Sequence, residues 1–279
     1  MGYEYYEFQR LDGPLTDKQR EELDEISSRS SPTRHAISFE YNYSELRADP
    51  ADLMRRYFDA GLHLSKYGTR RVMFRFPRNE RLADSLAEYR LHSVLQLDTT
   101  DNRILLDCTV SSPELGGWIP TGEGELDALV ELRDELLDGD LRAAYLMWLA
   151  GIAGVGTDVS PDDPEPPVPP GLDALTDPQQ QLCDFFGIDD HRLAPARAAS
   201  ADSPAGDEPD WEAAVDDLTE ETRRQFLARI ARGDTDAVAE LRATLRNTIE
   251  SAPLNNCRTT GRTVEDYWDA VHRHTDQRT

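Results

Sequence analysis

Residues 49–78 read DPADLMRRYFDAGLHLSKYGTRRVMFRFPR, and this stretch organises the rest of the chain. Asp49 can cap a helix that begins at Pro50, because proline at the first helical position lacks only an N–H that would be unpaired anyway. We expect this helix to run to Tyr67 and to end at Gly68, which fits a left-handed stop. Its apolar residues recur at roughly helical spacing: Leu53, Met54, Tyr57, Phe58, Leu62 and Leu64.

The end of the same stretch has the two-residue period of a strand. Val72, Phe74 and Phe76 alternate with arginine and methionine, so one face of the strand is expected in the core. Pro77 ends this predicted strand because it cannot donate a ladder hydrogen bond. We also expect His63, which stands between two leucines, at the edge of the core.

This stretch also carries the largest concentration of positive charge in the chain. Residues 55–81 contain eight basic and two acidic side chains, whereas the whole chain has a net charge of −24. We favour the interpretation that these arginines pair with carboxylates of the C-terminal half and hold the protein together. The alternative is an anion-binding or nucleic-acid-binding surface within residues 70–81, formed by Arg70, Arg71, Arg75 and Arg78.

The rest of the chain is acidic, and the acidity is uneven. Residues 1–110 have a net charge of −3 and residues 111–279 have a net charge of −21, so the second half would repel nucleic acids and anionic membranes. The basic residues are 28 arginines and only two lysines. We therefore expect a salt-rich, halophilic cytosol, where salt screens the self-repulsion, although GC-rich coding also favours arginine over lysine.

Several classes of protein are disfavoured by missing signals. Cys108, Cys183 and Cys257 are far apart and form no CxxC pair, which argues against a disulfide framework or a zinc site. The first ten residues are neither basic nor apolar, so we expect no signal peptide and a cytoplasmic location. No phosphate-binding GxxxxGK[ST], HExxH or GxSxG motif occurs. We accordingly expect no cofactor, no metal site, no catalytic residues and no membrane partner.

The periodicities predict an α+β fold, with a mixed or antiparallel N-terminal sheet and a mainly helical C-terminal half. We expect three parts: an α+β domain over residues 1–111, a packed helical extension over 112–200, and a disordered linker with a small helical segment over 201–279. The proline-rich residues 158–171 are expected to be a wrapping linker and not a ligand for a proline-binding module, because a basic flank is missing. The expected strands are 3–11, 36–43, 72–76, 92–97 and 104–110. The expected helices with both ends assigned are 16–27, 80–89, 126–137, 141–152, 211–232 and 236–251, and the helix over 211–232 is expected to break near Thr219. Two more helices are expected to begin after Thr176 and after Thr263.

Short motifs in a fixed order suggest a family. They are Tyr6-Glu7-Phe8-Gln9, Pro14-Leu15-Thr16, Arg56-Tyr57-Phe58-Asp59-Ala60, Gly68-Thr69-Arg70-Arg71, Gly139-Asp140-Leu141-Arg142-Ala143 and Glu165-Pro166-Pro167-Val168-Pro169-Pro170-Gly171-Leu172. Over about residues 3–200 the chain resembles a family of uncharacterised proteins from GC-rich bacteria. It departs from that pattern at Tyr43 and Tyr67, where tryptophan is expected. The resemblance implies no activity, cofactor or catalytic residue.

Three hypotheses of function follow. The first is a soluble, non-catalytic protein that acts through protein–protein contacts, because a well-patterned core is present without a convergent catalytic set. The second is nucleic-acid or anion binding by the four arginines of residues 70–78, although nucleic acid is not the favoured partner. The third is an enzyme of unknown class with Asp49, Arg56, Asp59 and Arg70 in a cleft.

Overall fold

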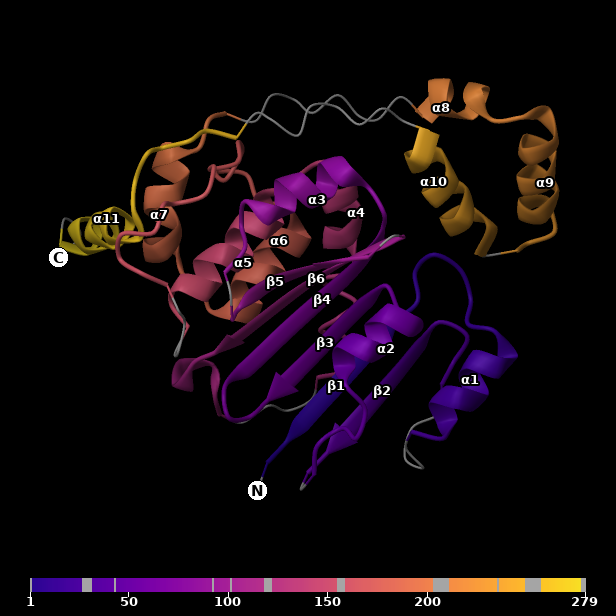
Figure 1. The fold of residues 1–279 in the computed structure, drawn as a ribbon, viewed down its shortest axis with the longest axis horizontal. Coiled ribbons are helices and arrows are strands. Elements are labelled where there is room, and N and C mark those ends of the chain that lie inside the picture. The colour runs from indigo at the N-terminus through magenta and orange to yellow at the C-terminus, as the bar shows by residue number, and fades with distance from the viewer. Residues whose placement is uncertain are drawn as a thin grey trace.

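The computed structural model describes residues 2–26, 32–42, 44–91, 93–100, 102–117, 122–154, 159–202, 211–234, 236–248 and 257–276. The fold is α+β, as the periodicities predicted: strands dominate the N-terminal half and helices the C-terminal half (Figure 1). The strands form one antiparallel sheet of six strands in the order β2-β1-β3-β4-β6-β5. Their bounds are β1 Glu4–Gln9, β2 Ala36–Tyr41, β3 Ala60–Ser65, β4 Thr69–Pro77, β5 Leu95–Thr99 and β6 Arg103–Ser111.

The helices begin largely where the sequence places a cap. Thr16 and Thr176 each form a capping box, with Gln19 and Gln179 respectively, and Thr219 separates two helices as expected. The bounds are α1 Asp17–Asp24, α2 Pro50–Arg56, α3 Glu80–Ala87, α4 Glu131–Leu137, α5 Arg142–Ile152, α6 Asp177–Phe186, α7 Asp190–Ala199, α8 Trp211–Asp217, α9 Glu220–Ala231, α10 Asp236–Thr248 and α11 Val264–Asp276.

The long helix predicted after Asp49 is wrong. Asp49 does cap α2, but the helix ends at Arg56, and residues 60–65 form β3 in the middle of the sheet. In β3 the leucines point to one face, and the residues between them point to the other. Gly68 has the expected positive φ of 93°, but it lies in the turn between β3 and β4 and not at a helix end.

Two further predictions need correction. Residues 123–130 form a series of turns, so α4 is shorter than the helix expected over 126–137, because the chain becomes helical only at Glu131. Helix α7 was not predicted, since Pro195 lies inside it and interrupts the helical pattern. Residues 203–210, which were expected to be disordered, lie outside the described residues.

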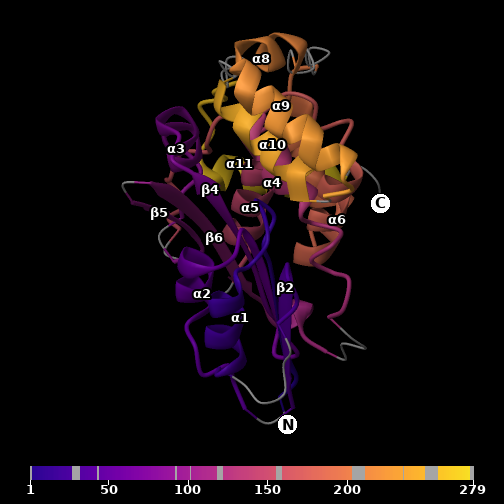
Figure 2. The same cartoon turned by 90° about the vertical axis from the view of Figure 1, so that its right-hand side faces the viewer.

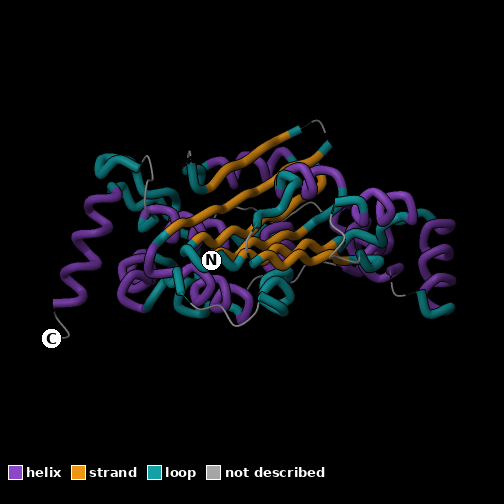
Figure 3. The backbone as a smooth tube through the Cα atoms, turned by 90° about the horizontal axis from the view of Figure 1, so that it is seen from below, coloured by secondary structure: helices purple, strands orange, loops and turns teal. Residues whose placement is uncertain are grey.

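Helices cover both faces of the sheet (Figures 2 and 3). One face packs on α3, α4 and α5 and, together with α6, forms the larger core, whose buried sheet residues include Leu62, Leu64, Val72, Phe74 and Phe76. Helix α5 is buried nearly all round, which fits its apolar sequence. The other face packs on α2 and α1, where Phe8, Met54 and Met73 form a second core.

The C-terminal helices lie at opposite ends of the molecule. Helix α11 packs on α7 at one end and contributes to the larger core, whereas α8, α9 and α10 lie at the other end (Figure 1). The proline-rich segment runs beside the chain that leads into α11, with bridges from Pro164 to Thr263 and from Val168 to Arg258. Within the described residues, no helix combines the length and apolar character needed to cross a membrane.

Candidate functional site

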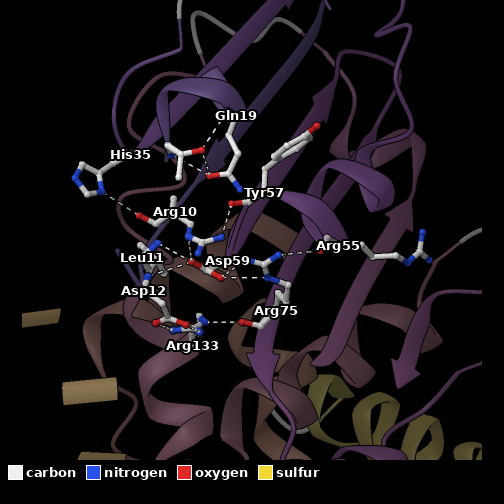
Figure 4. Close-up of polar contacts among 11 residues, drawn as sticks. Arg10, Leu11, Asp12, Gln19, His35, Arg55, Tyr57, Asp59, Arg75 and Arg133 are labelled. Atoms are coloured by element: carbon white, nitrogen blue, oxygen red, sulfur yellow. Dashed lines mark hydrogen bonds and ion pairs between the residues drawn. The ribbon is translucent and has the colours of Figure 1, made fainter. Parts of the chain in front are cut away.

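Asp59 is the centre of the most extensive ion-pair network among the predicted site residues (Figure 4). Its side chain is buried, and its Oδ1 accepts hydrogen bonds from Nε and Nη2 of Arg75 at 3.1 and 2.7 Å. Its Oδ2 accepts from the backbone N–H groups of Leu11 and Asp12 at 2.9 and 3.0 Å. Nε of Arg10 lies 3.5 Å from the same oxygen, as an ion pair.

The sheet ladder places these groups together. Asp59 stands one residue before β3, and its backbone N–H donates to Gln9 O at the end of β1. On its other side the backbone N–H of Arg75, in β4, donates to Asp59 O at 2.9 Å. Three adjacent strands therefore fix the register, and the side chains of Asp59 and Arg75 meet as cross-strand neighbours.

Helix α4 joins the network through Arg133. This side chain is only 2% exposed, and it donates from Nε to Arg75 O at 2.7 Å. Its two other nitrogens bind both oxygens of Asp12, 121 residues earlier in the chain. The paired arrangement fits guanidinium geometry, and it ties α4 to the loop after β1.

The charges at this site favour an ionised Asp59. Burial alone would raise the pKa of Asp59, but the neighbouring guanidinium groups of Arg133, Arg75 and Arg10 outweigh it and hold this pKa below its usual range. Both carboxylate oxygens already accept hydrogen bonds, so Asp59 has no role open to it as a general base without losing a structural contact. The network holds these elements in place, and its geometry leaves no free carboxylate oxygen on Asp59 for catalysis.

A second polar row crosses the same face at the other end of the strands. Arg71 in β4 donates from Nε and Nη2 to the two oxygens of Asp107 in β6, at 2.8 and 2.6 Å. Glu4 in β1 accepts from the Ser65 hydroxyl at 2.7 Å and lies 2.5 Å from Nε2 of His63. The second apolar core separates this row from the Asp59 network.

His63 is the group of this row whose pKa is lowered. It lies on β3 with its ring stacked on Tyr6 at a centroid distance of 4.2 Å, which agrees with its predicted place at the edge of the core. Burial lowers the pKa of His63, while the hydrogen bond to Glu4 opposes this shift. A neutral imidazole oriented by a carboxylate resembles a general base, but the described residues hold no nucleophile bonded to it.

The remaining arginines of residues 70–78 do not join these rows. Arg70 points to the opposite face of the sheet, where it lies over the Phe185 ring and donates to Leu115 O at 3.4 Å. Burial lowers the pKa of Arg70. Arg78 follows the end of β4 and pairs with Glu80 at 2.6 Å. The four predicted anion-binding side chains therefore lie on both faces and at one end of the sheet.

The acidic residues that pair with these arginines differ from those that we expected. We expected the arginines to pair with acids of residues 111–279, but Arg71, Arg75 and Arg78 pair with acids of the N-terminal half. The ladder explains the first two pairs, because residues on adjacent strands meet at short range whatever the charge of the other half, whereas Arg78 and Glu80 are close in sequence. The link between the halves at this site runs the other way: Arg133 of α4, in the C-terminal half, binds Asp12 of the N-terminal half.

The four side chains of the predicted cleft do not converge. Asp49 accepts a hydrogen bond from the backbone N–H of Ala51 as the cap of α2. Arg56 is exposed and lies 3.3 Å from Glu22 of α1. Asp59 is buried in its own network, and Arg70 lies across the sheet from it. Arg10, Asp12 and Arg133 complete the Asp59 network and were missed, because their separation in sequence gives no local signal.

No metal centre is evident in the part of the chain that the structure describes. No group of three or more His, Cys, Asp and Glu side chains there could hold a metal ion. Two surface pockets of about 260 and 280 Å³ share Val159 and Val264 beside α5 and α11. None of the residues of the two polar rows lines either pocket.

Comparison with known proteins adds no assignment. No protein-family model matches the chain, and no curated protein or solved structure matches it. The function must therefore be inferred from the geometry itself.

Proposed function

We propose that this chain is a non-catalytic protein that acts through protein–protein contacts in a salt-rich cytosol. The observation that carries the proposal is the closed network at Asp59, where both carboxylate oxygens are filled and Arg75 is held by two hydrogen bonds. Such a network supports a rigid body in which the sheet and α4 are fixed to each other. The charged side chains of this network bind one another and hold the sheet and α4 together.

The same pairs argue against the nucleic-acid alternative. A phosphate would have to displace Asp107 from Arg71 or Asp59 from Arg75, and each of those arginines already makes two charge-assisted hydrogen bonds. Arg70 lies on the other face of the sheet, so it cannot join them in one phosphate-binding surface. The acidic second half would add long-range repulsion.

The exposed apolar side chains support a contact role. Among the described residues, the large hydrophobic side chains that stay exposed are Tyr67, Leu227, Ile230 and Val238. Three of these four belong to α9 and α10, at the end of the molecule farthest from α11 (Figure 1). Concentration of exposed apolar groups on one small helical unit is typical of a surface that a protein partner covers.

Site-specific photo-cross-linking tests this proposal. A photoreactive amino acid at the exposed position 231 on α9 should give a covalent protein adduct in the cells that make this chain. The adduct should disappear with Leu227→Asp, and a photoreactive group at position 67 should give no adduct that depends on Leu227. Absence of any adduct at position 231, or an adduct unchanged by Leu227→Asp, would overturn the proposal.

A further inference from the structure

Two adjacent pockets form one groove between α5, the proline-rich segment and α11, which we call the α5–α11 groove. The first pocket, of about 260 Å³, includes Trp148 of α5, and the second, of about 280 Å³, includes Trp268 of α11. Val159 and Val264 line both pockets, so the two are continuous. Each is smaller than the roughly 300–1,000 Å³ of a typical small-molecule site, so a protein side chain fits each pocket better.

Backbone hydrogen bonds hold the walls of the groove in place. The N–H of Val264, at the start of α11, donates to Asp163 O at 2.9 Å. The next N–H, of Glu265, donates to Pro161 O at 2.9 Å. The N–H of Ser160 donates to a carboxylate oxygen of Asp163 at 2.8 Å. The proline-rich segment is therefore fixed against α11, and a ligand does not have to order this wall when it binds.

Carboxylates outnumber cations around the groove. Each pocket is lined by two of them, which are Glu88 and Asp163 in the first pocket and Glu265 and Asp269 in the second. Among the described residues of both linings, the one basic side chain is that of Arg90. Within the described part of the chain, the carboxylates of Glu88, Glu265 and Asp269 form no hydrogen bond or ion pair. The charge of the groove is therefore complementary to a cationic ligand.

The two tryptophans narrow the class of cation. Trp268 already has one guanidinium group near its ring, since Arg192 of α7 lies 6.0 Å from the ring centroid. Trp148 is held in place by stacking on Tyr145 at a centroid distance of 5.7 Å. Arginine both stacks on aromatic rings and pairs with carboxylates, so it matches the lining of each pocket. Salt screens the exposed carboxylates, but it does not screen the burial of an arginine stem against the two valines.

We propose that the α5–α11 groove binds an extended segment of another protein in which two arginines are separated by one residue, with one arginine side chain in each pocket. Successive side chains of an extended chain point to opposite sides, so residues two apart point the same way, roughly 7 Å from each other. Alternate residues can therefore enter two adjacent pockets of the same chemistry, whereas neighbouring residues cannot.

A second copy of this chain cannot supply that segment. None of its arginines stands two positions from another arginine. The one pair of basic residues at this spacing, Lys18 and Arg20, lies on helix α1 and is not extended. The groove also lies at the end of the molecule opposite α8, α9 and α10, so it is a contact surface separate from Leu227 (Figure 1).

Fluorescence anisotropy of the full chain with a labelled peptide tests this proposal. The probe peptide has two arginines separated by one alanine and flanked by further alanines, and the control peptide has the same composition with the two arginines adjacent. We expect saturable one-to-one binding of the probe at about 0.1 M KCl. The control should bind roughly threefold more weakly or worse, because its two arginine side chains cannot enter both pockets.

Variants with opposite charge changes should move the affinity in opposite directions. Glu265→Gln together with Asp269→Asn should raise the dissociation constant of the probe by about threefold or more, whereas Arg90→Gln should lower it. The matched control is Glu212→Gln with Asp217→Asn, which removes two charges from exposed positions of α8, far from the groove. Circular dichroism of each variant shows whether the fold is retained.

Absence of saturable binding would overturn the proposal, as would equal affinity for the two peptides. Equal losses of affinity in the two double variants would also refute it, because they would show attraction to net charge and not to the groove. If tetramethylammonium displaces the probe at a concentration near the dissociation constant of the probe itself, the groove binds small organic cations and the proposed partner is wrong. Each of these failures leaves the cross-linking result at position 231 unchanged, because α9 takes no part in the groove.

Discussion

Arg75 donates two hydrogen bonds to one oxygen of Asp59, at 3.1 and 2.7 Å, while the other oxygen is held by two backbone N–H groups after β1. Both side chains are buried. The pair is flanked by Arg10 and Arg133, so removal of the one central carboxylate would leave several cations in a poorly solvated site. Asp59 is therefore the member of this network whose replacement should damage the fold most.

Asp59→Asn should destabilise the fold by about 3–5 kcal/mol, because it leaves buried guanidinium groups without their counter-charge. Urea denaturation followed by circular dichroism measures the change in the free energy of unfolding. The matched control is Asp98→Asn, which breaks the exposed contact with Arg55 at 2.9 Å and should cost less than about 1 kcal/mol. Equal costs for the two variants would show that the Asp59 network is not an important source of stability.

The pH dependence of stability should separate the wild type from Asp59→Asn. The pKa of Asp59 is lowered in the folded state, so its contribution is fully present above the unfolded value of about 3.9. The contribution is lost as pH falls through the lower folded value, because the carboxyl is then protonated in both the folded and the unfolded state. The difference in unfolding free energy between the two proteins should therefore shrink below about pH 4. A difference that stays constant down to about pH 2 would contradict the lowered pKa.

Gly68→Ala should be much more damaging than Gly117→Ala, although both glycines have positive φ, at 93° and 135°. A Cβ at position 68 would meet the backbone O of Ser112 at 2.0 Å, whereas a Cβ at position 117 meets nothing within 4 Å. We expect a loss of about 2–5 kcal/mol for Gly68→Ala against about 1–3 kcal/mol for Gly117→Ala. Thermal or urea unfolding of the two variants measures this, and equal losses would refute the close approach of the two loops.

Thiol labelling should proceed in a fixed order. Cys108 and Cys183 are buried, and burial raises the pKa of both, that of Cys183 to about 12. Cys257 is half-buried, and burial raises its pKa as well, so it should react slowly but before the others. Labelling of the native protein followed by mass spectrometry should give one modified site, and denaturant should open the other two. Simultaneous labelling of all three thiols would contradict the packing of α5 and α6.

The sequence allowed the fold class and most elements to be predicted because their signals are local. Capping at Thr16 and Thr176, alternation from Val72 to Phe76 and the all-round apolar character of α5 each need only neighbouring residues. The prediction for the segment after α2 was wrong because the apolar residues there also match helical spacing. What favours a strand there is tertiary: at Gly61 a side chain would meet Met54 and Phe8 across the second core.

The candidate site was predictable only in part, for a related reason. Asp59 and Arg75 were each singled out by charge, but nothing in their sequence positions indicates that β3 and β4 place them opposite each other. Arg133 lies 121 residues from Asp12, and that partnership depends on how α4 packs on the sheet. Long-range pairs of this kind are set by the assembled layers, so a charge count along the chain cannot assign partners.

Arginine-modification footprinting of the native protein, with peptide mass spectrometry as the readout, tests most directly whether the arginines of β4 are held in ion pairs within the fold. If they are, Arg71 and Arg75 should remain unmodified in the native protein and react only after unfolding. Arg224 on α9 and Arg232 just after this helix are both exposed and should react first. If Arg71 and Arg75 instead react as fast as Arg224, they are free to bind an anion, and their proposed structural role is wrong.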